Sequence, residues 1–337
     1  MAKIVLGIGT SHSPQLTLKP EQWHLRTEAD QRNPELWYRG KPYVFSELVE
    51  ERAGAHFERE LGMETYQGRY TACQNSLDRL AEIFEKVAPD VAVIFGDDQH
   101  ESFVDDNMPA MSVYWGETVD TAPLVAEGSD RARESGILTA QLGHTREVRT
   151  THPCEPGLGQ HIIERLIEDE FDVARSSSLP PGRHENHSIG HAFGFVYRRI
   201  MRDEVIPHVP IFLNTYFPPN QPSMKRCYDL GKAVRRAIES WDSDKRVVVI
   251  ASGGLTHFVI EEDLDQQVIG AFKAKDEKGL AAIPIKHFMS GTSETRNWAA
   301  AAGAMHASDL QFDLIDYVPC YRSEAGTGCA MAFAQWA

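Results

Sequence analysis

The sequence predicts an α/β fold: a single domain of 337 residues with a central mixed, mostly parallel sheet, flanking helices and an active site at the strand ends. Three observations lead to this prediction. Short apolar runs alternate along the chain with amphipathic segments of helical period. Two of the runs, Val91–Phe95 and Arg246–Ala251, are almost continuously apolar, which is typical of strands buried on both faces of a parallel sheet. Glycine and polar residues directly follow several runs, where such sheets place their ligand sites.

The elements follow from these patterns in order along the chain. In Cys73–Val87, apolar residues recur on one helical face, and Pro89 ends the helix because proline cannot continue it. The polar, weakly periodic stretch 17–64 is expected to be a helical insertion over the active-site mouth or an oligomer contact. The expected strands are Ile4–Ile8, Val91–Phe95, Met111–Trp115, Phe171–Ala174, Val209–Tyr216, Arg246–Ala251 and Phe312–Val318. The expected helices are Cys73–Val87, Leu158–Asp169, Met224–Trp241, Leu264–Ala274 and Thr295–Met305.

Composition narrows the classes of function. The formal net charge of −15, with no stripe of Lys and Arg to offset it, argues against a nucleic-acid partner. The five cysteines are scattered and lack CxxC spacing, which indicates reduced thiols rather than a disulfide framework or a zinc finger. No apolar run approaches the length of a membrane span, and the N-terminus lacks the apolar region of a signal peptide. We therefore expect a cytoplasmic protein without a membrane partner.

Histidines stand at the ends of three expected strands. Gly9–Pro14 follows the first strand and presents His12, which a rigid strand end would hold in place as a metal ligand or as a hydrogen-bonded cap. Gly96–Phe103 follows the second apolar run and carries acidic residues, an amide and an imidazole in one turn. Gly253–His257 repeats the pattern of glycines followed by one imidazole. If the sheet is parallel, these side chains meet at one edge.

Two further clusters add candidate ligands. A run of carboxylates, Glu261–Asp265, opens an expected helix, although acidic residues are also favoured there by the helix dipole. Three histidines occur within His184–His191. One or two imidazoles, a carboxylate and a spare titratable histidine are the parts of a non-haem Fe(II) site with an acid–base group beside it. Zinc hydrolases use similar ligands, so residue types alone do not choose the metal.

These motifs, in this order, resemble the class III (LigB-type) extradiol ring-cleavage dioxygenases. The group includes protocatechuate 4,5-dioxygenase, gallate dioxygenase and 3-O-methylgallate dioxygenase, and the methylgallate branch is the most similar in appearance. The segments that carry the resemblance are Gly9–Pro14, Gly96–Phe103, Tyr114–Gly116, Gly190–His191, Asn214–Pro219, Gly253–His257, Glu261–Asp265, Ser290–Trp298 and Gly303–Ala304. The resemblance implies Fe(II), a small aromatic substrate and O₂, and we expect a homodimer.

The resemblance also implies residue roles. His12 would be an iron ligand and His257 the acid–base histidine. One carboxylate after His257 would be the third ligand: we favour Glu262, while an alternative pairing of the motif selects Asp263.

The second ligand is where this chain departs from the family pattern of Asn-Asp-His. Without a gap, the family histidine falls on Gln99, and His100 supplies an imidazole one position later. A shift of one residue in extended chain turns the side chain to the other face. Gln99 through its amide oxygen, His100 through a bulge, or Glu101 would each complete the set, and the sequence leaves all three open.

The remaining roles concern the substrate. His191 matches a family histidine that faces the substrate beside the metal. Ser293 and Arg296 lie where related enzymes contact a ring carboxylate, and Tyr216 is a further candidate pocket residue. An arginine there would form charge-assisted hydrogen bonds to that carboxylate.

Three functions compete at this point. The first is an Fe(II) extradiol dioxygenase that cleaves a catechol-type carboxylic acid such as 3-O-methylgallate, gallate or protocatechuate. The second is a zinc or manganese hydrolase on the same ligands. The third is a non-catalytic binding protein of the same superfamily. The ordered set of motifs favours the first.

Overall fold

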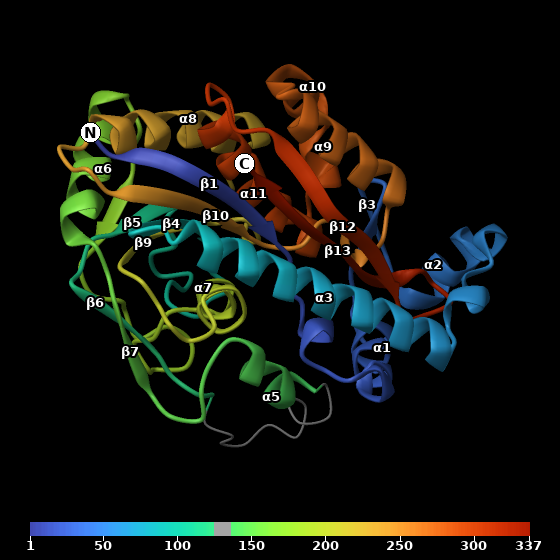
Figure 1. Ribbon diagram of the computed structural model, residues 1–337. Helices are drawn as coiled ribbons and strands as arrows, with labels where there is room; N and C mark the ends of the chain where they lie inside the picture. Colours follow the sequence, from blue (N-terminus) through green and yellow to red (C-terminus); the bar gives the residue numbers. More distant parts are fainter. Residues whose placement is uncertain (125–135) are drawn as a thin grey trace.

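The computed structural model describes residues 1–124 and 136–337, which form an α/β domain around one large sheet (Figure 1). Among the described residues this sheet has nine strands in the order β11-β13-β1-β10-β4-β9-β5-β8, with β12 paired to β13. The strands are β1 (Lys3–Thr10), β4 (Val91–Asp97), β5 (Met111–Tyr114), β8 (Ala174–Ser176), β9 (His208–Leu213), β10 (Arg246–Ser252), β11 (His257–Val259), β12 (Phe312–Tyr321) and β13 (Thr327–Trp336).

The four central strands are parallel, and antiparallel pairs flank them. β1 pairs with β10, β10 with β4 and β4 with β9, all in parallel register. On one side β13 runs antiparallel to β1, and on the other β5 runs antiparallel to β9. The expected fold class, a mixed sheet with a parallel centre and flanking helices, is confirmed. Because the parallel strands all end at the same edge, the residues that follow β1, β10 and β4 are brought together.

Helices cover both faces of the sheet (Figure 1). Alternate residues of each central strand point to opposite faces of the sheet. Val93 and Val249 pack in a cluster with residues of two helices, α8 (Met224–Ser240) and α11 (Thr295–Met305). Ile94 and Ile250 pack in a cluster with residues of α3 (Met63–Val87). The helices are α3 (Met63–Val87), α6 (Pro156–Glu168), α7 (His191–Phe195), α8 (Met224–Ser240), α9 (Glu262–Ala274), α10 (Glu277–Ala282) and α11 (Thr295–Met305). None of the helices described is long and apolar enough to cross a lipid bilayer.

The peripheral segments are smaller. The stretch expected as a helical insertion, 17–64, holds α1 (His24–Gln31) and α2 (Phe45–Glu51), together with a hairpin of β2 (Leu36–Tyr38) and β3 (Lys41–Tyr43) that was not expected. A second hairpin joins β6 (Thr118–Thr121) and β7 (Thr150–Pro153). The short α5 (Ile137–Ala140) lies beside the pocket described below.

Several predicted strands differ in their limits, and for two of them hydrogen bonds give the reason. β9 stops at Leu213, because the Asn214 amide donates to the carbonyl of Phe217 and accepts from its N–H, which folds the chain into a turn. The strand expected at Phe171–Ala174 begins only at Ala174. Phe171 instead closes the end of α6, where its N–H donates to the carbonyl of Leu166.

The last strand, β13, was not predicted. Its sequence is rich in alanine, which has a low preference for strands. The strand is nevertheless almost fully buried, because it pairs with β1, β11 and β12 at the same time. Tertiary pairing here overrides local preference.

Helices α8 and α11 approach backbone to backbone through two glycines. A Cβ at Gly231 would lie 1.8 Å from the carbonyl oxygen of Ala300, and one at Gly303 would lie 2.0 Å from that of Tyr228. Neither backbone can move without separating the helices, so larger residues are excluded here.

We therefore expect Gly231→Ala to lower the free energy of unfolding by at least about 2 kcal/mol, in the range of overpacked cores. Gly68→Ala is the matched control, because a Cβ at Gly68 in α3 meets nothing within 4 Å. That exposed change should stabilise the protein by about 0.5–1 kcal/mol. Urea unfolding of both variants measures the difference, and equal effects at the two positions would contradict the close helix contact.

Candidate active site

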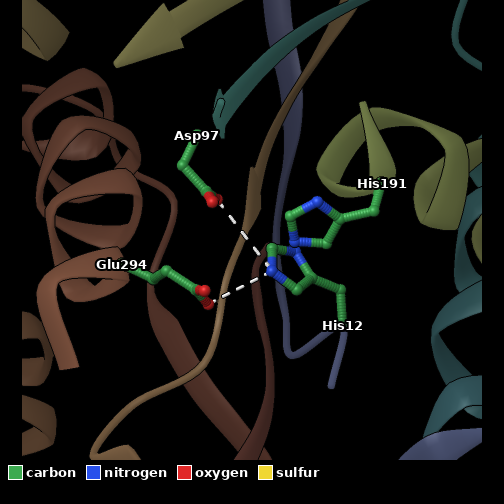
Figure 2. Close-up of side chains that lie close together, drawn as sticks. All are labelled: His12, Asp97, His191 and Glu294. Atoms are coloured by element: carbon green, nitrogen blue, oxygen red, sulfur yellow. Dashed lines mark ion pairs between the residues drawn. The ribbon is translucent and has the colours of Figure 1, made fainter. Parts of the chain in front are cut away.

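Side chains from the ends of two central strands and from two helices converge on one buried point (Figure 2). His12 lies just beyond β1, and Asp97 is the last residue of β4. His191 begins α7, and Glu294 immediately precedes α11. One potential ligand atom from each of the four lies within 4.8 Å of the others, so the group can hold a metal ion. The expectation of a site at the strand ends is met by this geometry.

The tautomer of His12 follows from its hydrogen bonds. The Ser252 hydroxyl donates to the carbonyl oxygen of Ala192 at 2.6 Å, so its oxygen accepts from Nδ1–H of His12 at 3.0 Å. In the neutral ring the proton therefore sits on Nδ1, and Nε2 carries the lone pair. That nitrogen lies 3.1 Å from a carboxylate oxygen of Glu294 and 3.9 Å from one of Asp97.

This arrangement fits a bound cation. A nitrogen lone pair aimed at two carboxylates is repulsive unless positive charge lies between them. Among the described residues, Nε2 of His12 has no hydrogen-bond partner, although it is buried. Imidazole nitrogens and carboxylate oxygens are the ligands that non-haem iron, zinc and manganese prefer. The donor set therefore fits the metal that the sequence motifs imply.

The Glu294 carboxylate is the centre of the group. It accepts from the backbone N–H of Gly254 at 2.8 Å and from the amide of Gln99 at 3.2 Å, and it lies 3.2 Å from Nε2 of His257. Burial alone would raise the pKa of Glu294, but the imidazoles of His257 and His12 hold it well below its usual value. Glu294 is thus an anion at neutral pH.

Asp97 behaves differently. Its Oδ1 accepts from the amide of Asn297 at 3.1 Å. Burial raises the pKa of Asp97, and the neighbouring Glu294 raises it further. Two carboxylates this close favour one negative charge between them unless a cation is present.

His191 is held by Glu101. Its Nδ1 lies 2.8 and 2.9 Å from the two carboxylate oxygens, and its backbone N–H donates to the same group at 3.0 Å. Burial alone would lower the pKa of His191, but the Glu101 carboxylate raises it to about 10. His144, which lies near it, is the opposite case: burial, followed by the charge of His191, lowers the pKa of His144 to about 3.

His257 stands beside the group on a firmly held turn. Its Nδ1 lies 2.8 Å from the carbonyl oxygen of Leu255, so in the neutral ring the proton sits there and Nε2 faces Glu294. Burial would lower the pKa of His257, but Glu294 outweighs this and raises it above its usual value. Such a nitrogen can accept a proton from a neighbouring group.

The turn that carries His257 is fixed by Asp265 in α9. Its carboxylate accepts from the backbone N–H of Thr256 at 2.9 Å, from the Thr256 hydroxyl at 2.6 Å and from the Tyr317 hydroxyl at 2.7 Å. Burial raises the pKa of this buried carboxyl group to about 7. Asp265 therefore positions His257 without touching it.

A pocket opens onto these side chains. His12, Gln99, His191, His257 and Glu294 all line it. Its other walls combine apolar residues with cations, and these include Phe195, Ile137, Ala140, Arg26, Arg183 and Arg322. Arg322 forms a buried ion pair with Asp30 at 2.7 and 2.8 Å.

The structure brings together only some of the residues singled out from the sequence. His12, His191, His257 and Gln99 meet at the pocket. His100 turns away from it: the ring stacks on Phe217 at a centroid distance of 3.7 Å, and Nε2 lies 3.2 Å from Asp105. Glu101 reaches the site, but through His191.

The favoured carboxylate ligand, Glu262, is not brought to the group. It accepts a hydrogen bond from the Tyr321 hydroxyl at 2.7 Å, and with Asp263 it lines a separate surface hollow. The carboxylates that do reach His12 are Asp97 and Glu294. Both lie inside segments that carried the family resemblance, and each stands where a strand ends or a helix begins. This position in the sequence was the signal that could have identified Asp97 and Glu294 as candidate ligands.

The expected contacts to a substrate carboxylate are not at the pocket either. Arg296 is fully buried, and its guanidinium donates to the carbonyls of Pro222, Thr215, Phe288 and Ser293 at 2.7–3.2 Å. It therefore joins the segment between β9 and α8 to the segment that precedes α11. Ser293 is also fully buried, and Tyr216 contacts the ring of Phe217. None of the three is among the residues that line the pocket in the described part of the chain.

The Asp265 anchor has a pH signature. Its pKa is raised to about 7, whereas in an unfolded chain it is about 3.9. Between these values the folded protein binds a proton that the unfolded chain releases, so this group's contribution to stability decreases as the pH rises. The side chain of Asp265→Asn cannot titrate. The melting temperature of this variant minus that of the wild type should therefore increase from about pH 4 to 7 and stay constant at higher pH. A difference that stays constant with pH would contradict the raised pKa.

Comparisons with known proteins identify relatives of this chain that are named as ring-opening dioxygenases. Residues 65–326 match the family model described as the catalytic LigB subunit of aromatic ring-opening dioxygenase. The chain is 35% identical over 105 residues to a gallate dioxygenase of Pseudomonas putida, which covers 30% of this chain and 28% of the relative. It is 28% identical over 197 residues to a 2,3-dihydroxyphenylpropionate/2,3-dihydroxicinnamic acid 1,2-dioxygenase of Rhodococcus jostii, with coverages of 56% and 52%.

The aligned regions thus span between about a quarter and a half of these two relatives. A crystal structure of an uncharacterized protein from Escherichia coli K12 aligns with a TM-score of 0.43 and 13% identity, over 78% of this chain and 92% of that one. The family match covers well over half of the sequence and contains most of the site, including Asp97, His191, His257 and Glu294. The chain belongs to the LigB family of aromatic ring-opening dioxygenases.

Proposed function

We propose that this protein is an Fe(II)-dependent extradiol dioxygenase that opens the ring of a catechol-type aromatic carboxylate. The observation that carries the proposal is the lone-pair nitrogen of His12, buried against the carboxylates of Glu294 and Asp97 in a pocket that also contains His257. The two relatives reported above are named for their action on gallate and on 2,3-dihydroxyphenylpropionate. Their names support a substrate of this class. Bound Fe(II) would bind the catechol oxygens and O₂ and would pass electron density from the catechol to O₂.

The protein's own residues have separate roles in the proposed reaction. His12 and Glu294 supply a nitrogen and an oxygen ligand that face each other (Figure 2). His257 takes the proton of a catechol hydroxyl at Nε2, because its Nδ1–H is already donated to Leu255. It can return that proton later in the reaction, a role that suits an imidazole near neutral pH. The Glu294 carboxylate beside it stabilises the protonated ring.

The negative charge of the substrate would be attracted by residues of the pocket and not by the net charge of the protein. The net charge of −15 repels an anion at long range. Arg26, Arg183 and Arg322 line the pocket, and these cations lie close enough to meet a charged substituent of the ring. A carboxylated catechol is therefore favoured over an uncharged one. The expected homodimer and the cytoplasmic location stay predictions.

Oxygen uptake tests the function directly. Metal-free protein, prepared with a chelator under argon, should be inactive and should regain activity with Fe(II) but not with Zn²⁺. Gallate, 3-O-methylgallate and protocatechuate should each be offered, and turnover should consume one O₂ per ring and yield a yellow ring-opened product. Activation by Zn²⁺ with hydrolysis and without O₂ uptake would favour the hydrolase, and binding without turnover would favour the non-catalytic protein.

The role of His257 is tested by His257→Gln, which keeps a side chain of similar length in a space tightly bounded by Gly254 and Gly291. We expect turnover to fall by about 10²–10⁴-fold, the usual contribution of a general acid–base group. Iron content and the dissociation constant of the substrate should stay within a factor of a few. If the variant loses iron in proportion to activity, His257 is a ligand instead.

A further inference from the structure

Two histidines, not one, direct a ring nitrogen at the buried carboxylates. The rings of His12 and His191 meet edge to face, with centroids 4.6 Å apart and an interplanar angle of 74°. Figure 2 shows His191 approaching the group from α7, on the side opposite Glu294. Its second ring nitrogen therefore faces the point that His12 and Glu294 also face.

Glu101 fixes the orientation of the His191 ring. The carboxylate is bound to both Nδ1 and the backbone N–H of His191, so the remaining nitrogen, Nε2, is the one directed at the group. The preceding residue must be glycine for this contact, because a Cβ at Gly190 would lie 2.1 Å from a Glu101 oxygen. A carboxylate behind the far nitrogen of an imidazole is the usual support of a metal-binding histidine.

The turn after β4 does not provide a competing imidazole. Gln99 directs its amide nitrogen to the carboxylates, 3.4 Å from Asp97 and 3.2 Å from Glu294, and so acts as a donor to possible ligands. His100 is stacked on Phe217, outside the pocket. Within the described part of the chain, His12 and His191 are thus the two imidazoles of the four-residue group.

We propose that His191, oriented by Glu101, is the second nitrogen ligand of the metal and completes a two-histidine, one-carboxylate set with His12 and Glu294. Gln99 then holds the Glu294 carboxylate in position and does not bind the metal. Asp97 lies beside the ion and accepts from Asn297. The inference rests on the proposed function for the presence of a metal, but it assigns His191 to the metal rather than to the substrate.

The number of imidazoles bound to Co²⁺ is the direct measurement. Co²⁺ is added to metal-free protein without substrate or O₂, and X-ray absorption counts the imidazoles from their multiple-scattering signal. The wild type should show two, and His191→Ala should show one and bind Co²⁺ about 100-fold more weakly. Glu101→Gln should keep two imidazoles and lose about 10- to 100-fold in affinity, as outer ligand supports do.

Two control variants separate the alternatives. Gln99→Ala should keep two imidazoles and an affinity within tenfold of the wild type. His144→Ala removes a buried imidazole from the same pocket, at a ring distance of 6.0 Å from His191, and should leave the count at two. Circular dichroism and melting temperature establish that each variant is folded, and the wild-type count does not depend on any variant.

The outcomes are distinct from those of the function test. One imidazole in the wild type, or an unchanged count and affinity in His191→Ala, would overturn the assignment. Loss of Co²⁺ binding in Gln99→Ala alone would make Gln99 the ligand. A protein that binds Co²⁺ through two imidazoles but consumes no O₂ with any catechol would keep the assignment and refute the proposed function.

Discussion

The arrangement of the site depends on the buried carboxylate of Glu294. It lies within hydrogen-bond distance of the Gly254 N–H, the Gln99 amide and the imidazoles of His12 and His257, so one side chain links the ends of β1, β4 and β10 with the start of α11. A buried carboxylate is costly unless it is hydrogen-bonded and paired with positive charge. Each neighbour of Glu294 meets part of this requirement. The same requirement makes the centre a site for a cation, because the protein's own donors leave the lone pair of His12 facing the carboxylate.

The sheet brings these groups together, and small residues allow the close approach. Parallel pairing aligns the carboxyl ends of β1, β10 and β4, so His12, Asp97 and the Gly253–Gly254 turn meet without long connections. Trp298 of α11 packs directly on Gly9 of β1, where a Cβ would lie 2.3 Å from the indole ring. Its indole N–H donates to the carbonyl of Gly253 at 2.7 Å. The helix that carries Glu294 is thereby locked onto the two strands that carry the histidine and the glycine turn. Positioning within fractions of an ångström, as metal and acid–base chemistry require, is obtained from this packing.

The sequence predicted the parts of the fold that depend on local pattern. The buried strands β4 and β10 and the helices α8 and α11 were found nearly to the residue, because continuous apolar runs and regular helical spacing are local signals. β13 was not predicted, because its alanines are ordered by three neighbouring strands rather than by their own preference.

Among the site residues, His12, His191 and His257 were identified from glycine-rich strand ends and clustered histidines, and the structure places all three at the pocket. Glu294 was overlooked in favour of Glu262. Both glutamates stand near the start of a helix, and only tertiary packing shows that α11, not α9, points its first turn at His12.

The charge balance of the pocket explains why so many ionisable groups are buried together. Asp97 and Glu294 are buried, Glu101 is partly buried, and the three acids face His12, His191 and His257. Buried ionic networks of this kind stabilise a fold little, because desolvation offsets most of the attraction. They persist where function needs charged groups held in fixed positions. Glu101 lies behind His191 and is already paired with it, whereas Asp97 and Glu294 both approach Nε2 of His12. Two acids directed at one point, with imidazole nitrogens beside them, are balanced by a divalent cation better than by any single proton. The electrostatics of this chain therefore favour a metal centre independently of the family to which it belongs.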